Sequence, residues 1–338
     1  MKYKLLGKTG VRVAQIALGT ANFGKRWGHG ADEAESAMIF NAYAEAGGNF
    51  IDTADVYQFG QSEEFLGTLL DGRREDFFLA TKFTSGAAAD ANRLVTGNSR
   101  KAMVASVEAS LKRLKTDRSD LYWVHHPDAV TPSEEIVRGL DDLMRSGKIL
   151  YAGLSNFPAW RLARAATLAE LARTVPIAAA QFEYSLVHRD PEADLFPACQ
   201  ALGIAPVTWS PLGGGMLTGK YRKGETGRAE ALGGKVFQAE NSQLRSAALD
   251  EVLLIADEMQ VSPDQVAIAW IASQGALPVI GPRSLTQLTS NLGAASLTLS
   301  TAQLASLALA SAGTRDTATA PAVSLDDSAL EAASIPVA

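Results

Sequence analysis

The chain has 338 residues, of which 47% are apolar and 20% charged, an ordinary composition for a globular protein with a large core. With 31 Lys and Arg against 37 Asp and Glu, its net charge of -6 gives no reason to expect nucleic acid or an anionic membrane as a partner. No run approaches the ~18 uncharged apolar residues of a membrane span, and the first residues lack a signal peptide's apolar core, so the sequence indicates a cytoplasmic protein.

Short apolar runs alternate with longer amphipathic stretches along the chain. Tyr3–Leu6 and Val11–Val13 predict a hairpin around Gly7 to Gly10. Eight further runs are too short for helices and almost continuously apolar, as parallel strands buried on both faces are. They are Ile16–Leu18, Asn49–Asp52, Phe77–Lys82, Asp120–His125, Ile149–Leu154, Ile177–Gln181, Pro206–Trp209 and Leu277–Ile280.

Segments with helical periodicity lie between these runs. Two apolar stripes are expected to be buried: Val104, Val107, Leu111 and Leu114, and then Ile136, Leu140 and Leu143. Three segments are typical of helix N-termini, because they combine a capping residue with an early proline or a capping-box side chain. These segments are Asp32 to Glu35, Thr131 to Glu134 and Ser262 to Gln265.

Eight strand–helix units predict a (β/α)₈ barrel, a TIM barrel with an N-terminal β-hairpin. A doubly wound sheet is the alternative, but Gly19 to Gly24 does not have the spacing of its phosphate-binding turn. The long connections 84–99 and 211–244 both follow strands, where barrel loops form an active site. We expect one domain over residues 1–312 and a partly ordered surface tail over 313–338.

Polar residues follow the predicted strands at the end where a barrel places its active site. Asp52 ends one strand, Tyr57 follows it closely, and Lys82 ends the next strand. The pKa of a free tyrosine, ~10, is too high for efficient proton donation at neutral pH, and a nearby ammonium lowers it. A carboxylate can hold that ammonium, and His125 can orient a carbonyl oxygen. Each residue alone could instead cap a helix or face solvent.

The cysteine and histidine content disfavours a metal enzyme. Cys199 is the only cysteine, which excludes an internal disulfide and a zinc site built on several thiolates. The four histidines, His29, His125, His126 and His188, lack the helical spacing of a metal motif. We therefore predict no metal site.

Five motifs in order along the chain resemble the aldo-keto reductase superfamily, NADP-dependent barrel oxidoreductases. The motifs are Asp52–Tyr57, Ala80–Lys82, Asp120–His125, Gly153–Asn156 and Trp209–Leu212. The resemblance extends from the hairpin to about Asn291. It implies reversible reduction of an aldehyde or ketone by a catalytic tetrad of Asp52, Tyr57, Lys82 and His125, with Tyr57 as the general acid.

The resemblance also implies a cofactor, NADPH, lying extended across the rim of the barrel. The nicotinamide end is assigned to Ser155, Asn156, Gln181 and, by stacking, Trp209. The rest of the cofactor is assigned to Gly19, Thr20, Ala21, Asp52, Ser210, Pro211, Leu212, Gly214, Lys220, Gly281, Arg283, Gln287 and Asn291. Gln287 and Asn291 are expected to face the same way on a short helix. Arg283 alone supplies a cation in the adenosine segment, so NADPH is favoured and NADH is the alternative.

The substrate pocket implied by the resemblance is aromatic and apolar. Its expected residues are Phe23, Trp27, Phe83, His126 and Phe157. Strand alternation puts the two histidines on different faces, since His125 shares a face with Leu121 and Trp123, whereas His126 points with Tyr122 and Val124. The resemblance favours His125 as the catalytic one, with His126 lining the pocket or packed at the surface. The partner is therefore a small carbonyl or alcohol compound, but its identity, the preferred direction and the oligomeric state do not follow from the sequence.

A different class of function also resembles this sequence. Some relatives are regulatory subunits of potassium channels that bind the cofactor mainly as a redox sensor, and the stretches Trp209–Leu212 and Lys220–Tyr221 are similar to theirs. The presence of His125, and a chain that starts directly at the hairpin, favour an enzyme. Steady NADPH turnover with simple aldehydes would distinguish the two functions.

Overall fold

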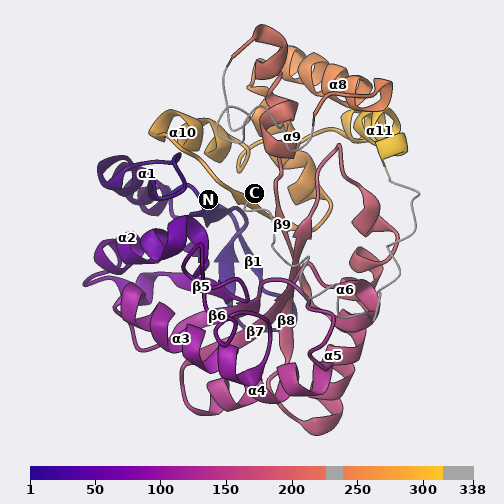
Figure 1. Ribbon diagram of the computed structural model, residues 1–338. Helices are drawn as coiled ribbons and strands as arrows, with labels where there is room; N and C mark the ends of the chain where they lie inside the picture. Colours follow the sequence, from indigo (N-terminus) through magenta and orange to yellow (C-terminus); the bar gives the residue numbers. More distant parts are fainter. Residues whose placement is uncertain (226–238, 315–338) are drawn as a thin grey trace.

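The predicted strands all form within two residues of their expected bounds. The computed structural model describes residues 1–225 and 239–314, and its central feature is a closed barrel of parallel strands (Figure 1). The barrel strands are β3 (Ala17–Gly19), β4 (Phe50–Asp52), β5 (Phe78–Phe83), β6 (Ser119–Val124), β7 (Ile149–Ser155), β8 (Ile177–Glu183), β9 (Ala205–Trp209) and β10 (Leu277–Ile280). Because β10 pairs with both β9 and β3, the sheet has no edge, which confirms the barrel and excludes the doubly wound sheet.

Helices surround the barrel (Figure 1). In the described part of the chain the α-helices are α1 (Glu33–Glu45), α2 (Gln61–Leu69), α3 (Arg100–Leu114), α4 (Ser133–Arg145), α5 (Ala159–Ala172), α6 (Leu195–Leu202), α8 (Gln243–Met259), α9 (Pro263–Ser273), α10 (Leu285–Gly293) and α11 (Thr301–Ala310). None of these helices is long and apolar enough to cross a membrane.

The two expected apolar stripes are buried apart from one residue. Ile136, Leu140 and Leu143 of α4 face the core, as do Val107, Leu111 and Leu114 of α3. Val104 was wrongly placed, since it is 38% exposed, and Met103 occupies the buried position instead. The stripe of α3 therefore begins one residue earlier than the sequence predicted.

One of the three expected helix caps uses its side chain as predicted. Asp32 caps α1 by accepting a hydrogen bond from the Glu35 backbone N–H at 3.0 Å. Thr131 does not cap α4, because that helix begins at Ser133 and the Thr131 hydroxyl donates to Asp128 instead, at 2.7 Å. Ser262 precedes α9, which starts with a proline as expected, but its side chain forms no capping bond.

The hairpin of β1 (Tyr3–Leu5) and β2 (Arg12–Ala14) closes the N-terminal end of the barrel. Leu6 and Val13 join the apolar cluster inside the barrel, and the Lys8 backbone N–H donates to the Gly203 carbonyl at 3.0 Å. Gly7, at φ 57°, sits so close that a Cβ there would lie 2.7 Å from that carbonyl oxygen. A site for a ligand is therefore left at the opposite, C-terminal end.

The long connections that follow β5 and β9 lie at that C-terminal end, as expected. The first ends where Ser99 caps α3, and the second ends where Ser242 caps α8. Part of the second, residues 226–238, lies outside the described residues. After α11 and one short turn the described chain ends at 314, so the prediction of a surface tail also lies outside them.

Candidate active site

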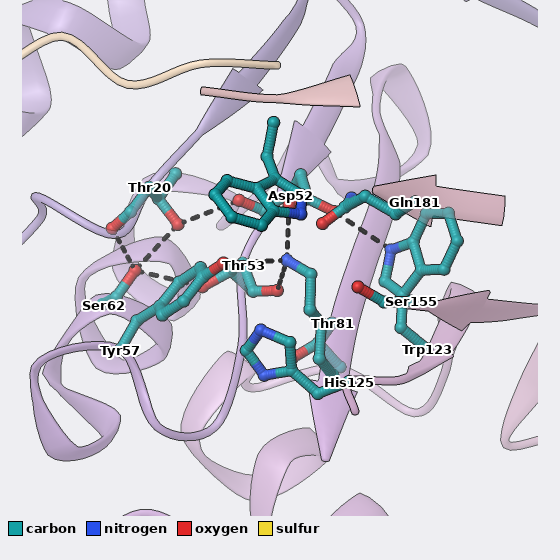
Figure 2. Close-up of polar contacts among 12 residues, drawn as sticks. Thr20, Asp52, Thr53, Tyr57, Ser62, Thr81, Trp123, His125, Ser155 and Gln181 are labelled. Atoms are coloured by element: carbon teal, nitrogen blue, oxygen red, sulfur yellow. Dashed lines mark hydrogen bonds and ion pairs between the residues drawn. The ribbon is translucent and has the colours of Figure 1, made fainter. Parts of the chain in front are cut away.

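Lys82 lies at the centre of the predicted tetrad. Its side chain points into the barrel from β5 and is 0% exposed. The ammonium Nζ lies 2.5 Å from Asp52 Oδ2 and 3.1 Å from Tyr57 Oη, and it donates a third bond to the Thr53 carbonyl at 3.0 Å. Asp52, Thr53, Tyr57 and His125 gather around this point in Figure 2.

The charge state of Lys82 follows from these contacts. Burial alone would lower the pKa of its ammonium, but the Asp52 carboxylate and the Tyr57 oxygen outweigh burial, and the pKa is raised above its ordinary value. Lys82 therefore stays positively charged although it has no contact with solvent. A fixed positive charge stands beside the Tyr57 hydroxyl.

Two uncharged donors hold the second carboxylate oxygen of Asp52. The indole N–H of Trp123 and the amide Nε2 of Gln181 both donate to Asp52 Oδ1, each at 3.0 Å. Asp52 is 2% exposed, so these bonds and the Lys82 ion pair replace the water that the carboxylate loses. The carboxylate is thereby fixed beneath Lys82.

His125 and His126 follow β6 with their rings stacked, the centroids 4.3 Å apart. His125, which the resemblance favours as catalytic, is the one beside Tyr57, at 5.8 Å between centroids. Burial, with the nearby His126 and Lys82, lowers the pKa of His125 well below its ordinary value, and burial with Lys82 lowers that of His126 to about 4. Both imidazoles are therefore neutral at neutral pH.

Asn156 fixes the tautomer of His126. The indole N–H of Trp209 donates to Asn156 Oδ1 at 3.0 Å, which leaves only the amide nitrogen to face His126 Nδ1, 3.1 Å away. Because an amide nitrogen only donates, Nδ1 accepts, and the proton of His126 resides on Nε2. Asn156 itself has a left-handed backbone, φ 61°, which turns its side chain back toward β6.

A second charged cluster braces the loop that carries Tyr57. Glu63 of α2 is fully buried and accepts from Arg113 of α3 at 2.7 Å and from the Thr81 hydroxyl at 2.5 Å. Asp55, two residues before Tyr57, is buried nearby, and burial together with Glu63 raises its pKa to about 8. Asp55 is therefore largely protonated at neutral pH. The bonds of Glu63 tie β5, α2 and α3 together beside the Tyr57 loop.

Two of the five expected pocket residues lie beside the tetrad. Trp27 meets Tyr57 edge-on at 6.1 Å, and His126 stacks on His125. The other three expectations do not fit the structure: Phe23 and Phe83 are fully buried, and Phe157 is 4% exposed beneath the Arg161 guanidinium. Phe83 stacks on Tyr122 because, next to the inward-facing Lys82, it must point toward the helices.

The residues expected at the nicotinamide end are brought together at the ends of β7, β8 and β9. Ser155 Oγ accepts from Asn156 Nδ2 at 3.0 Å, and Asn156 accepts from Trp209 as described. Trp209 is half-buried, whereas Ser155 is fully buried and Gln181 is 3% exposed. Side-chain bonds thus join Trp209, Asn156 and Ser155, while Gln181 accepts from the Asn156 N–H through its backbone carbonyl at 2.7 Å and bonds Asp52 of the tetrad through its side chain.

The loop after β9 turns sharply on glycines. Gly213, Gly214 and Gly215 all have positive φ, and the Ser210 hydroxyl, itself on a left-handed residue, accepts from the Gly214 N–H at 3.2 Å. Pro211 is buried and Leu212 half-buried at the same turn. The following Lys220 is half-buried, and burial and the nearby Arg283 guanidinium lower its pKa. The two cations expected to meet the cofactor therefore lie close to each other.

The segments expected at the far ends of the cofactor differ in exposure. Asn22 donates to the Gly281 carbonyl at 2.8 Å, linking the loop that begins with Thr20 and Ala21 to the end of β10. Gln287 is exposed and accepts from the Arg283 N–H at 2.9 Å. Asn291, by contrast, is buried and donates to Asp264 at 2.6 Å. Gly19 and Thr20 are buried against β10 and Ser62.

Comparison with known proteins agrees with this geometry. The sequence profile described as the Aldo/keto reductase family matches residues 15–311. The chain belongs to the aldo/keto reductase family. This aldo/keto reductase is thus an oxidoreductase of the class that interconverts carbonyl compounds and alcohols.

This aldo/keto reductase is similar in sequence to three relatives over most of their length. It is 34% identical over 310 residues to an uncharacterized oxidoreductase, YrpG, of Bacillus subtilis, covering 88% of this chain and 92% of the relative. It is 34% identical to the norsolorinic acid reductase of Aspergillus flavus, covering 88% of this chain and 77% of the relative. It is also 34% identical to an NADP(+) aryl-alcohol dehydrogenase of Phanerodontia chrysosporium, covering 87% and 82%.

Sequence reasoning missed several contacts within this aldo/keto reductase. The ring of Trp123 lies inside the barrel and holds Asp52. The position of Trp123 on the same strand face as His125 was the available signal. Gln58 and Asn22 were not singled out, and nothing in their local sequence indicates the loop contacts that they make.

Proposed function

We propose that this protein is an NADPH-dependent reductase of aromatic aldehydes and ketones, with Tyr57 as the proton donor. One observation carries the proposal: the Tyr57 hydroxyl lies 3.1 Å from the Lys82 ammonium, whose charge is kept by a buried bond to Asp52. Such a hydroxyl has a fixed cation ready to stabilise the phenolate that remains when its proton leaves.

The protonation states of the neighbouring residues support Tyr57 as the proton donor. Reduction adds a hydride to the carbonyl carbon and a proton to the oxygen, which gains negative charge as the hydride arrives. His125 and His126 are neutral at neutral pH, so neither is an imidazolium acid there. The imidazole of His125 instead orients the carbonyl oxygen toward Tyr57. Asp52 acts through Lys82 as a positioning residue.

The residues present fit a nicotinamide cofactor, which supplies the hydride when bound. Ser155, Asn156 and Gln181 offer polar atoms near the half-buried Trp209, whose indole N–H donates to Asn156. The Arg283 guanidinium is near enough to Lys220 to lower its pKa, and two such like charges favour an anion such as a phosphate. Arg283 is the residue that we assign to the 2′-phosphate, and NADH is the weaker alternative.

Aromatic substrates are favoured by the rings around Tyr57. Trp27 lies edge-on to both Tyr57 and Phe59, at 6.1 and 6.2 Å, and His126 lies on the other side of His125. Aromatic rings prefer such edge-to-face partners. One relative carries a name that denotes action on an aryl compound, aryl-alcohol dehydrogenase.

Cofactor absorbance tests the proposal directly. Benzaldehyde, 2-naphthaldehyde, acetophenone and propanal are each mixed with the protein and NADPH or NADH, and the corresponding alcohols with NADP or NAD. We expect steady NADPH consumption, fastest with the aryl aldehydes and slower with NADH. Binding of NADPH without turnover of any of these compounds would instead favour a redox sensor over an enzyme.

A further inference from the structure

The two residues that follow Tyr57 have an unusual backbone. Gln58 (φ 51°, ψ 34°) and Phe59 (φ 53°, ψ 49°) are both left-handed, although neither is glycine or asparagine. Non-glycine residues keep such conformations only where the surrounding contacts enforce them, and they gather at functional sites. The side chain of Gln58 is fully buried, so its contacts are the first place to look for that enforcement.

The amide of Gln58 bonds three backbone groups of a different segment, the loop between β3 and α1. Its Oε1 accepts from the Trp27 N–H at 2.8 Å, and its Nε2 donates to the carbonyls of Ala21 and His29 at 3.2 and 3.1 Å. The partners fix the orientation of the amide, because an N–H needs an oxygen and the two carbonyls need a nitrogen. One side chain thus holds the loop on both sides of Trp27.

Other bonds hold the same loop without reaching Trp27. Gln61 Oε1 accepts from the N–H groups of Lys25 and Arg26 at 2.8 and 3.2 Å. Arg26 also pairs with Glu64 of α2 at 2.7 Å. Gln61 therefore provides a matched comparison: a glutamine three residues from Gln58 that holds the same loop but not the tryptophan.

The position of Trp27 decides what can lie beside Tyr57. Its indole meets the Tyr57 ring at 83° and the Phe59 ring at 82°, and it contacts His29 at 6.1 Å between centroids. A flat, fixed indole edge favours a substrate that is itself an aromatic ring, because edge-to-face packing depends on both rings being held. A small aliphatic carbonyl gains little from it.

We propose that Gln58 is a positioning residue that fixes Trp27 against Tyr57 and thereby makes the site select aromatic over small aliphatic carbonyls. This inference rests on the proposed carbonyl reductase function. Gln58 does not touch the substrate. It sets substrate choice through the loop that it binds. Gln58 itself lies on the same turn as the proton donor, Tyr57.

The test compares two substrates in four single variants and one double variant. Gln58→Asn tolerates the left-handed backbone but is one methylene too short to keep the three bonds, and Gln58→Gly relieves the backbone without any side chain. In both, kcat/KM for 2-naphthaldehyde should fall ~10-fold, mainly through KM, while that for propanal stays within about threefold. Gln61→Asn should change the ratio of the two substrates less than about twofold. In a Trp27→Leu background, Gln58→Asn should lower the aryl rate no further.

The outcomes separate this inference from the proposed function. A wild-type protein that reduces none of the aldehydes overturns the proposed function itself. A normal wild type whose Gln58 variants lose both substrates equally shows that Gln58 supports Tyr57 rather than substrate choice, and overturns the inference alone. Retention of the full aryl preference in Gln58→Asn, or an equal loss in the Trp27→Leu background, overturns it as well. Thermal unfolding of each variant shows whether a uniform loss is only a loss of fold.

Discussion

Gln181 donates a hydrogen bond from Nε2 to Oδ1 of Asp52, 3.0 Å away, and so joins strands that lie on opposite sides of the barrel. Gln181 lies in β8, two residues before its end at Glu183, and Asp52 ends β4, with three strands between them in either direction around the sheet. The resemblance had assigned Gln181 to the cofactor. The structure gives it a second role, as an anchor of the carboxylate that holds Lys82.

Gln181→Leu should therefore lower kcat even when the cofactor is saturating. A hydrogen bond to a charged group contributes ~1.5–3 kcal/mol, and its loss lets Asp52 shift under Lys82, so kcat should fall at least ~10-fold. Initial rates at several NADPH concentrations check this. A variant whose KM for NADPH rises while kcat is unchanged would show that Gln181 only contacts the cofactor and does not anchor Asp52.

Lys82→Met should abolish turnover and also destabilise the fold. The substitution removes the cation beside Tyr57, and it leaves the Asp52 carboxylate, 2% exposed, without its ion-pair partner. Removing one member of a buried pair costs ~3–5 kcal/mol of unfolding free energy. Chemical denaturation with NADPH turnover in parallel measures both losses.

A double variant separates stability from catalysis. Adding Asp52→Asn to Lys82→Met removes the unpaired negative charge of the Asp52 carboxylate, while the new amide oxygen still accepts from Trp123 and Gln181. Most of the lost unfolding free energy should return, and turnover should stay absent. Recovery of activity along with stability would mean that Lys82 acts only as a structural partner of Asp52.

Strand periodicity carried the prediction of the fold and of the tetrad. Parallel strands buried on both faces read as apolar runs, and their polar C-terminal residues converge because the barrel closes. The same alternation would have excluded Phe83 from the predicted pocket, because its neighbour Lys82 faces inward and Phe83 must therefore face Tyr122. The pocket list was drawn from aromatic character without applying that rule.

Loop contacts could not be predicted in this way. The burial of Phe23 and Phe157, and the bonds from Gln58 to the loop around Trp27, depend on how segments between strands fold over the rim. No sequence signal marks Gln58 as left-handed, because that conformation is typical of glycine and asparagine. Contacts across the barrel, such as Gln181 with Asp52, require the closed sheet itself.

Arg283→Ala should weaken NADPH binding more than NADH binding. Arg283 lies near Lys220 at the rim, and its guanidinium is suited to grip a phosphate through charge-assisted hydrogen bonds. Its loss should raise the Kd for NADPH ~10- to 100-fold, or ~1.4–3 kcal/mol, with little change for NADH. Titrations of cofactor fluorescence give both constants. Equal weakening of the two cofactors would show that Arg283 supports the loop rather than reads the 2′-phosphate.

Tyr57→Phe should remove catalysis and preserve the site. The substitution deletes one hydroxyl and keeps the ring that Trp27 and His125 contact. General acid catalysis contributes ~10²–10⁴ in rate, so kcat should fall by that factor, with the Kd for NADPH within a few-fold of wild type. A Tyr57→Phe enzyme that reduces benzaldehyde at nearly the wild-type rate would show that another group donates the proton.

The pH profile of reduction should lack a step near the ordinary histidine pKa of ~6.5. Burial and Lys82 lower the pKa of His126 to about 4, and burial, with His126 and Lys82, lowers that of His125 well below its ordinary value. The raised pKa of Lys82 keeps its ammonium charged over the same range. Neither histidine nor Lys82 therefore changes charge between about pH 5 and 8 by these contacts. Reduction should decline only in alkali, as Tyr57 loses the proton that it must donate, while alcohol oxidation should rise there.

We expect kcat/KM for benzaldehyde to be flat across pH 5–8 in buffers of constant ionic strength. A tenfold fall per pH unit above 6.5 would identify a histidine as the acid, and a His125→Gln variant that abolished that fall would assign it.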